Sequence, residues 1–406
     1  MTARTAAVLE PLPASCRRMI TVAPITSKSE WNAFKKVPQT IYRNDPNWIP
    51  DELVDLDALL INPKPFRRKC VDCQAYVAYD GGAAVGRIVA IEDHKYNNFH
   101  GDRVAFFGFY EAINSDEVAF RLLDAAANWA RQRSLTRLCG PLNTSMVSSD
   151  GLLINGYERP ALVGMPYNPE YYAGQLSRWG MHKVQDLHSE LLLNPFALLS
   201  SKRSLWERWR LRSSVTLRSV DKERVEQEAE VVKELYNVSF CRFFGFTPLD
   251  REEFLELVKS FLPILDEDLI LFAEIDGRCV GFLMLIPDVN QALIKAARSR
   301  NRLLRNLITL WYWKGPGRRR TMRHARCDML MVHPDCRDAG AAGLLVYEMF
   351  RRAQDKGYSS IEAAPLLEGN TWLRSGLAIP PGEPHRVYRV YGYELGTGQV
   401  MIGGSS

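Results

Sequence analysis

The same order of predicted secondary-structure elements occurs twice in this chain of 406 residues. In each half, two strand-like segments flank a tight glycine turn, Asp80-Gly81-Gly82 in the first and Asp276-Gly277 in the second. Such turns join the strands of a β-hairpin, because glycine readily adopts positive φ. A strand, an amphipathic helix and another strand then follow, at 103–111, 116–133 and 137–140 and again at 328–332, 340–356 and 359–364. The pattern predicts two related α/β units, each a mixed sheet flanked by helices.

The length agrees with two domains, since single hydrophobic cores rarely grow beyond about 250–300 residues. We expect a disordered leader at 1–18, where Glu10 and two prolines interrupt any apolar signal core. The expected boundaries are 19–195 for the first domain, 196–214 for a linker and 215–406 for the second domain. No apolar run approaches the roughly 18–20 residues of a membrane-spanning helix, so neither secretion nor a membrane span is expected.

The eight cysteines are scattered, and only Cys70 and Cys73 form a CxxC pair. No second CxxC or paired histidine completes a zinc site, so no metal site is expected. We interpret the cysteines as reduced thiols of a cytoplasmic protein. A redox or metal role for Cys70 and Cys73 stays open as the alternative.

Positive charge is concentrated in one segment, although the whole chain carries a net charge of only +5. Between Val289 and Cys327 there are eleven lysines and arginines and no acidic residue, so the remainder of the chain has a net charge of −6. Such local basicity indicates a local anionic partner and not a nucleic-acid-coating surface.

This basic segment, 289–327, forms an insert in the second domain. At 100° per residue, Leu293, Ala297, Leu304, Leu307, Ile308 and Trp311 share one helix face, which Arg300 interrupts. The residues predicted to contact a membrane are Lys295, Arg298, Arg302, Arg305, Trp311 and Trp313. A basic amphipathic helix with terminal aromatic residues is typical of helices that lie in a membrane interface, and anionic lipids would be its partner. The alternative is a helix packed on the domain with a solvated basic face.

The segment MVHPDCRDAGAAGLL, from Met331 to Leu345, leads from a strand into a helix. The N-terminus of a helix binds anions through its unpaired N–H groups and its partial positive charge. The small residues that would keep this approach open are Ala339, Gly340, Ala341, Ala342 and Gly343. Arg337 adds a permanent cation. Asp335 and Asp338 favour the alternative, a glycine-rich helix start without a ligand.

The spacing Arg337-x-x-Gly340-x-Ala342, after an apolar strand that ends Val332-His333-Pro334, resembles the acyl-CoA pyrophosphate loop of the GNAT acyltransferase superfamily. This resemblance implies that a strand N–H at or near Val332 polarises the acyl carbonyl. The corresponding helix of the first half begins INSDEVAF, with two acidic residues and no glycine or arginine. We therefore expect the second half, and not the first, to bind coenzyme A.

The whole chain resembles tandem-GNAT proteins grouped with bacterial ceramide synthases. The resemblance rests on FFGFYEAINSDEVAFRLLDAAANWARQRSLTRLCGPLNTS, GYERPALVGMPYNPEYYAGQLSRWGMHKVQDL, LLEGNTWLRSGLA and HRVYRVYGYEL. It implies an α/β (α+β) fold of two tandem GNAT-like domains that N-acylates a sphingoid base, 3-ketosphinganine or sphinganine, with acyl-CoA as co-substrate and no permanently bound cofactor. The enzyme would lie on the inner face of the bacterial inner membrane. Acyl or aminoacyl transfer to another amine, and a non-catalytic acyl-CoA- or membrane-binding protein, are the alternatives.

Amide formation from a thioester needs a base for the amine. Glu362 and Glu368 are the predicted carboxylates, with a salt-bridged structural role as the alternative for each. Asn370 matches the asparagine that begins the next helix in many GNAT proteins, where a helix cap is the alternative role. Seven residues later, Leu377 stands where the family often has a tyrosine as general acid. Tyr388 is the predicted replacement, with Tyr391 and His385 as further options.

In the first half, Tyr167, Asn168, Tyr171 and Tyr172 belong to a stretch that resembles the second GNAT motif. We expect these residues to shape the acceptor site between the halves. Packing in the core of the first half is the alternative.

Overall fold

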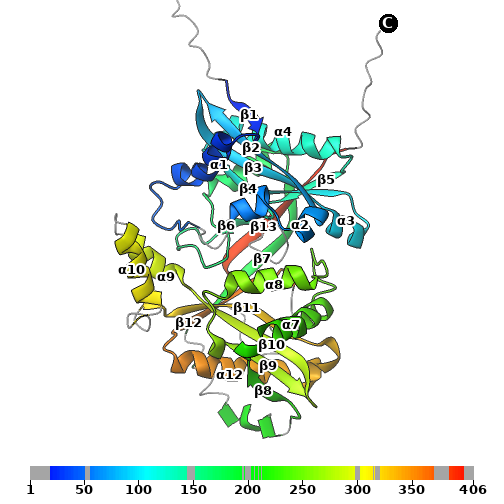
Figure 1. Ribbon diagram of the computed structural model, residues 1–406, viewed down its shortest axis with the longest axis vertical. Coiled ribbons are helices and arrows are strands. Elements are labelled where there is room, and N and C mark those ends of the chain that lie inside the picture. The colour runs from blue at the N-terminus through cyan, green and yellow to red at the C-terminus, as the bar shows by residue number, and fades with distance from the viewer. Residues whose placement is uncertain are drawn as a thin grey trace, which may run out of the picture.

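The computed structural model describes residues 19–50, 55–143, 151–193, 213–297, 302–313, 321–369 and 384–396, with 196, 203, 204, 206–208, 210, 211 and 315 as isolated positions. One mixed sheet runs through the molecule in the order β1-β2-β3-β4-β5-β13-β7-β12-β11-β10-β9-β8, and β6 pairs with β13 (Figure 1). Helices flank this sheet, so the predicted α/β class is confirmed.

The first half contributes the strands β1 (Thr21–Pro24), β2 (Val71–Asp80), β3 (Ala83–Asp93), β4 (Val104–Ala112), β5 (Arg137–Gly140), β6 (Leu152–Asn155) and β7 (His182–Leu193). Its helices are α1 (Lys28–Ile41), α2 (Pro65–Cys70), α3 (His94–His100), α4 (Asp116–Gln132) and α5 (Tyr171–Trp179), with a π-helical turn at Asp57–Ile61. The glycine turn predicted at 80–82 joins β2 to β3.

The second half contributes the strands β8 (Thr216–Ser219), β9 (Ile270–Ile275), β10 (Arg278–Pro287), β11 (His324–Val332), β12 (Ser360–Leu367) and β13 (Pro384–Glu394). Its helices are α7 (Val225–Ser239), α8 (Arg251–Phe261), α9 (Asn290–Ala297), α10 (Arg302–Trp313) and α12 (Ala341–Asp355). Short 3₁₀ turns lie at Lys222–Arg224, Glu267–Leu269 and Pro334–Ala339. The turn at Asp276-Gly277 joins β9 to β10, as predicted.

The last strand of each half crosses into the other half of the sheet. β13, from the end of the chain, pairs with β5, β6 and β7, whereas β7 pairs on its other side with β12. The two halves are therefore joined by continuous backbone hydrogen bonding, which the repeated order of elements does not reveal. The predicted domain boundaries remain a prediction. The predicted leader lies outside the described residues, as do nine of the nineteen positions of the predicted linker.

Two apolar layers cover the two faces of the second half's sheet. Leu283, Leu285 and Val332 belong to the core under α12, while Phe282 and Met331 belong to the core under α7 and α8. This alternation is the period of two that a strand imposes on its side chains. In the second half, the sheet is thus covered by helices on both faces.

Strands β11 and β12 pair in parallel only at the beginning of β11, where His324–Cys327 face Ser360–Ala363. From Asp328 to Val332, β11 pairs with no described residue of β12, and Met329–Val332 pair with β10. We call this stretch the open edge of β11. A β-bulge marks its start, because Met284 faces Met329 and Leu285 faces Cys327, which leaves Asp328 as the extra residue. Bulges are common beside active sites, where they redirect a side chain.

The basic insert forms two helices and not one, α9 and α10, with residues 298–301 between them outside the described part of the chain. Both helices stand at the edge of the molecule beside β12 (Figure 1). The base of the insert is tied to the first half, since Asp288 accepts a hydrogen bond from the Val163 N–H (3.3 Å) and the Asn290 amide donates to the Ala161 carbonyl (2.8 Å). No helix among the described residues is both long and apolar enough to cross a membrane.

Candidate active site

The predicted anion-binding loop lies between the open edge of β11 and helix α12. The chain turns through 3₁₀ geometry at Pro334–Ala339 and enters α12 at Gly340, whose φ is +78°. A Cβ at Gly340 would meet open space, so the backbone conformation, and not crowding, requires glycine here. The sequence therefore supplies glycine at the one position where the entry into the helix needs positive φ.

The first turn of α12 receives no side-chain cap from the described residues. Its N–H groups, from Ala341, Ala342 and Gly343, are the donors that a helix N-terminus offers to an anion. The Ser213 hydroxyl donates a hydrogen bond to the carbonyl of Ala339, just before the helix, at 3.2 Å. Two carboxylates directed at the loop would oppose the binding of a phosphate. Both acidic side chains are exposed, that of Asp335 to 86% and that of Asp338 as well.

Val332 and Arg337 flank this turn. Val332 ends β11 opposite Gly281, its side chain packs under α12, and its carbonyl accepts a hydrogen bond from the Ser239 hydroxyl at 3.4 Å. Arg337 is exposed. The structure thus brings together the whole predicted acyl-CoA set, Val332, Arg337 and 339–343, at one corner of the sheet.

The corresponding helix of the first half is already capped by its own side chains. The Ser115 hydroxyl accepts a hydrogen bond from the Val118 N–H (3.5 Å), and Asp116 in the first turn of α4 binds Arg178 at 2.6 and 2.8 Å. An added phosphate would meet the Asp116 carboxylate there, which is unfavourable. The contrast between α4 and α12 agrees with the expectation that only the second half offers an anion site.

The surroundings of Glu362 argue against its predicted role as general base. Its side chain is fully buried, and both of its oxygens lie 2.6 Å from one guanidinium nitrogen of Arg386. Burial alone would raise the pKa of Glu362, but hydrogen bonds from His324 and Arg386 outweigh burial and lower the pKa to about 2. A buried carboxylate that stays ionised in an ion pair is a poor proton acceptor.

Glu368 follows β12 and is exposed, with its carboxylate 2.6 Å from Lys183 Nζ. Its backbone N–H donates to the Asp186 carbonyl, which places it beside β7. It remains available to solvent and remains a predicted base. Asn370 and Leu377 lie outside the described residues.

Tyr388 is fully buried on β13, and its hydroxyl has no hydrogen-bond partner among the described residues. Burial is the main reason that the pKa of Tyr388 is raised, and Glu362 adds to this, while Arg386 opposes it. A phenol with a raised pKa and no solvent contact is a poor proton donor, so the structure argues against the predicted role as general acid. His385, the weaker option, lies against Arg159 and 3.8 Å from Glu362.

Sequence reasoning missed Asp328 and Arg326, which lie where β11 leaves β12. The Arg326 guanidinium is buried, pairs with Asp328 and donates to the Gly164 carbonyl at 3.1 Å. Its Nε has no partner among the described residues, an unusual condition for a buried donor. The only sequence signal is a pair of opposite charges within a mainly apolar strand, and the bulge that places Asp328 where β11 leaves β12 is invisible in the sequence.

The four residues expected to shape the acceptor site are engaged inside the first half. The Tyr167 hydroxyl donates to Asp45 (2.8 Å), and the Asn168 amide binds both the N–H and the carbonyl of Leu153. The Tyr171 hydroxyl donates to the Ala112 carbonyl, and that of the fully buried Tyr172 donates to Glu111. These contacts favour the packing alternative, because the polar groups of the four residues are already satisfied within the first half.

The predicted membrane contacts are placed only in part. Lys295 on α9 donates to the Thr321 hydroxyl (3.0 Å) and lies over the Tyr312 ring, while Trp311 on α10 is 54% exposed. Arg298 lies outside the described residues, as do the side chains of Arg302, Arg305 and Trp313. α10 also exposes Leu304, Leu307 and Leu310, so an apolar stripe faces outward at this edge of the molecule.

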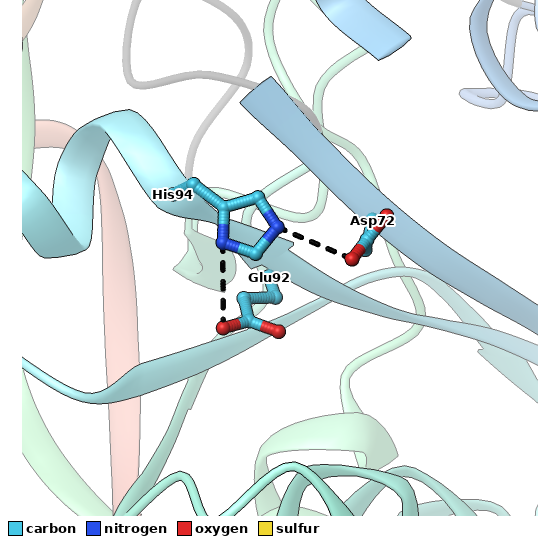
Figure 2. A group of neighbouring side chains, drawn as sticks. All are labelled: Asp72, Glu92 and His94. Atoms are coloured by element: carbon cyan, nitrogen blue, oxygen red, sulfur yellow. Dashed lines mark hydrogen bonds and ion pairs between the residues drawn. The ribbon is translucent and has the colours of Figure 1, made fainter. Parts of the chain in front are cut away.

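One cluster in the first half has the residue types of a metal site (Figure 2). His94 lies 3.2 Å from Asp72 and 3.5 Å from Glu92. The Arg133 guanidinium pairs with both carboxylates and supplies the cation that they require. Burial raises the pKa of the Cys70 and Cys73 thiols, which opposes the thiolate form that redox or metal chemistry needs.

The part of the chain that contains α12 is similar to a known protein family. The profile of the Acetyltransferase (GNAT) family matches residues 232–373. A bacterial ceramide synthase of Caulobacter vibrioides is 29% identical over 385 residues, which cover 92% of this chain and 97% of that protein. Protein YghO of Escherichia coli K12 is 26% identical over 380 residues, 91% of this chain and 94% of that protein.

Among solved structures, the fold is shared with a tandem GNAT protein from the clavulanic acid biosynthesis pathway. The TM-score is 0.51 at 12% identity, over 93% of this chain and 99% of that chain. The match extends over both halves, whereas the family profile covers the second half alone. The chain is therefore an acyltransferase with a tandem GNAT fold, and it is similar over most of its length to a bacterial ceramide synthase.

Proposed function

We propose that this acyltransferase moves a long-chain acyl group from acyl-CoA to the amine of a sphingoid base, 3-ketosphinganine or sphinganine. One observation carries the proposal: the uncapped N-terminus of α12 lies beside the open edge of β11 in a chain similar to a bacterial ceramide synthase. The pyrophosphate oxygens would accept hydrogen bonds from the N–H groups of residues 341–343, with Arg337 as a nearby cation. The N-terminal half would bind no second coenzyme.

The reaction forms a carbon–nitrogen bond and breaks the carbon–sulfur bond of the thioester. The amine nitrogen attacks the thioester carbonyl, the carbon–sulfur bond breaks, coenzyme A leaves as its thiolate, and the amine proton passes to a base. A backbone N–H at or near Val332 would stabilise the developing oxyanion. Glu362 is fully buried within its ion pair, whereas the paired carboxylate of Glu368 is half exposed and Asp328 lies at the bulge of β11. We therefore propose Glu368 or Asp328 as the base, directly or through a water.

The direct test incubates the purified protein with a long-chain acyl-CoA and each sphingoid base, and measures the amide by mass spectrometry and the released thiol by titration. We expect equal amounts of amide and thiol. Transfer to other amines alone would move the proposal to a different acceptor. No amide with any amine, together with intact acyl-CoA binding, would identify a binding protein and refute the transferase.

We also propose that α10 contacts an anionic membrane surface, from which the enzyme would collect its lipid amine. Leu307 is 64% exposed, and Leu304, Leu310 and Trp311 extend the same exposed stripe. The surrounding segment contains no acidic residue from 290 to 327. Apolar side chains next to concentrated basic charge are the combination that interfacial helices use.

Vesicle flotation tests this second proposal. The wild-type protein should float with anionic vesicles and much less with neutral ones, and Leu307→Glu should weaken flotation without a change in stability. Val238→Glu, at an exposed position of α7, serves as the matched control. Equal flotation of all three proteins, or equal binding to both vesicle types, would contradict the proposal.

A further inference from the structure

A cavity of about 460 Å³ lies between α7, α8 and the face of β9–β11 that points away from α12. This volume falls within the roughly 300–1,000 Å³ of small-molecule sites. It is separate from the predicted coenzyme loop, which lies at the N-terminus of α12, but both reach β11 near its open edge.

The lining is mainly hydrophobic: fifteen of the twenty lining residues are aliphatic, aromatic or methionine. The remaining five are charged, and each of them is neutralised by a partner. Glu228 binds Arg218, Asp266 binds Lys356, Lys222 binds Glu267, and Asp328 binds Arg326. An ionic ligand would find no unbalanced charge in the cavity, whereas a hydrocarbon chain would find a continuous apolar wall.

The lining of the cavity extends across three neighbouring strands of the sheet. It begins at Asp328 and Met329 on β11, passes Phe282 on β10 and Phe272 on β9, and reaches Lys222 after β8. Neighbouring strands lie roughly 4.8 Å apart, so the path from β11 to β9 alone is about 10 Å. One end of the cavity therefore lies at the bulge where β11 separates from β12, and the other lies at the outer surface.

We infer that this cavity binds a long unbranched alkyl chain, whose polar end lies at the Asp328 bulge. The inference deepens the proposed acyl transfer and rests on it for the identity of the chain. Both substrates of that reaction have such a chain, the acyl group of the thioester and the tail of the amine. Either one, inserted from the bulge, would leave its reacting carbon or nitrogen near the open edge of β11.

Chain-length dependence of binding follows directly from this arrangement. A buried methylene contributes about 0.8 kcal/mol, which corresponds to about a fourfold change in the dissociation constant. Affinity should therefore rise about fourfold for each added methylene until the cavity is full, and then level off.

Val232 on α7 provides the test, because it lines the cavity and is buried. Val232→Trp should displace about two methylenes and weaken long-chain binding about fifteenfold, while short-chain binding stays within twofold. Val232→Ala should extend the rise to longer chains. Val238→Trp is the matched control, since Val238 lies on the same helix, is exposed and does not line the cavity.

The measurement is equilibrium binding by calorimetry in two series, acyl-CoA of increasing acyl length and sphinganine analogues of increasing tail length. A shift in the first series supports the inference and assigns the cavity to the donor, and a shift in the second assigns it to the amine. Equal ratios of long- to short-chain affinity in wild type, Val232→Trp and Val232→Ala would overturn the inference.

Binding is measured without turnover, so the inference and the proposed function can fail separately. Chain-length-dependent binding with no amide product would retain the cavity and refute the transferase. Amide production with unchanged chain-length profiles would retain the transferase and refute the cavity. Short-chain affinity reports whether each variant is folded, and Val232→Ala keeps the test decisive if the tryptophan variant is unstable.

Discussion

Replacement of Glu362 by glutamine distinguishes a structural carboxylate from a catalytic base. The substitution keeps the shape of the side chain but removes the negative charge opposite Arg386, which is itself only 6% exposed. A buried cation without its partner is strongly destabilising, by roughly 3–5 kcal/mol. We therefore expect Glu362→Gln to lower the free energy of unfolding, whatever its effect on the reaction.

The depressed pKa of Glu362 gives an independent magnitude. The carboxyl has an ordinary pKa of 4.5 and a folded pKa of about 2, and each pKa unit corresponds to about 1.4 kcal/mol. The ionised pair thus contributes on the order of 3 kcal/mol at neutral pH. Because the folded pKa lies below the unfolded one, this contribution is complete above about pH 4.5 and is lost as the pH falls toward 2.

Urea unfolding of both proteins between pH 7 and pH 3 measures the effect. The difference in stability between wild type and Glu362→Gln should be on the order of 3 kcal/mol at pH 7 and should shrink below pH 4.5. Glu368→Gln is the control, since its exposed pair with Lys183 should contribute at most about 1 kcal/mol. A Glu362→Gln variant of unchanged stability that loses activity about a hundredfold would refute this reasoning and restore Glu362 as the base.

Three further substitutions test other parts of the site. Gly340→Ala should cost about 1–2 kcal/mol in unfolding free energy, because alanine is strained at φ +78°; an unchanged melting curve would contradict that backbone geometry. Tyr388→Phe should stabilise the fold by about 1 kcal/mol and keep kcat within about threefold, because the hydroxyl is buried without a partner; loss of stability would reveal one. Asp328→Asn should lower kcat by roughly a hundredfold or more if Asp328 is the base, and stopped-flow thiol release measures this; a fall for Glu368→Gln alone would assign the base to Glu368.

The sequence predicted the parts of the fold that depend on local patterns. The hairpins at 80–82 and 276–277 follow from turn glycines, and α12 begins where Gly340 and the small residues after it indicate. The exchange of β7 and β13 between the halves could not be predicted, because strand partners far apart in sequence leave no local signal. The cavity was equally hidden, since Val225, Ala229 and Val232 have the spacing of an ordinary core helix face.

Predictions for site residues also depended on whether the feature is local in the sequence or set by tertiary packing. The loop proposed to bind coenzyme A could be picked out from the sequence because it is one continuous segment. The roles predicted for Glu362, Tyr388 and Tyr172 could not be judged from the sequence, because burial and partners decide the role of a titratable side chain, and both depend on tertiary packing. Asp328 was missed because a one-residue bulge, and not a residue pattern, brings it to the edge of the sheet.

The most direct test of the account measures the rate of amide formation against acyl-CoA concentration, at saturating sphingoid base. It compares the wild-type enzyme with Arg337→Glu at the predicted loop and with Arg121→Glu on α4, an exposed arginine of the first half. Loss of a charge-assisted contact to phosphate is worth about 1.5–3 kcal/mol, so the KM for acyl-CoA should rise at least about tenfold in Arg337→Glu alone. An unchanged KM in Arg337→Glu, or an equal rise in Arg121→Glu, would contradict the assignment of coenzyme binding to the N-terminus of α12.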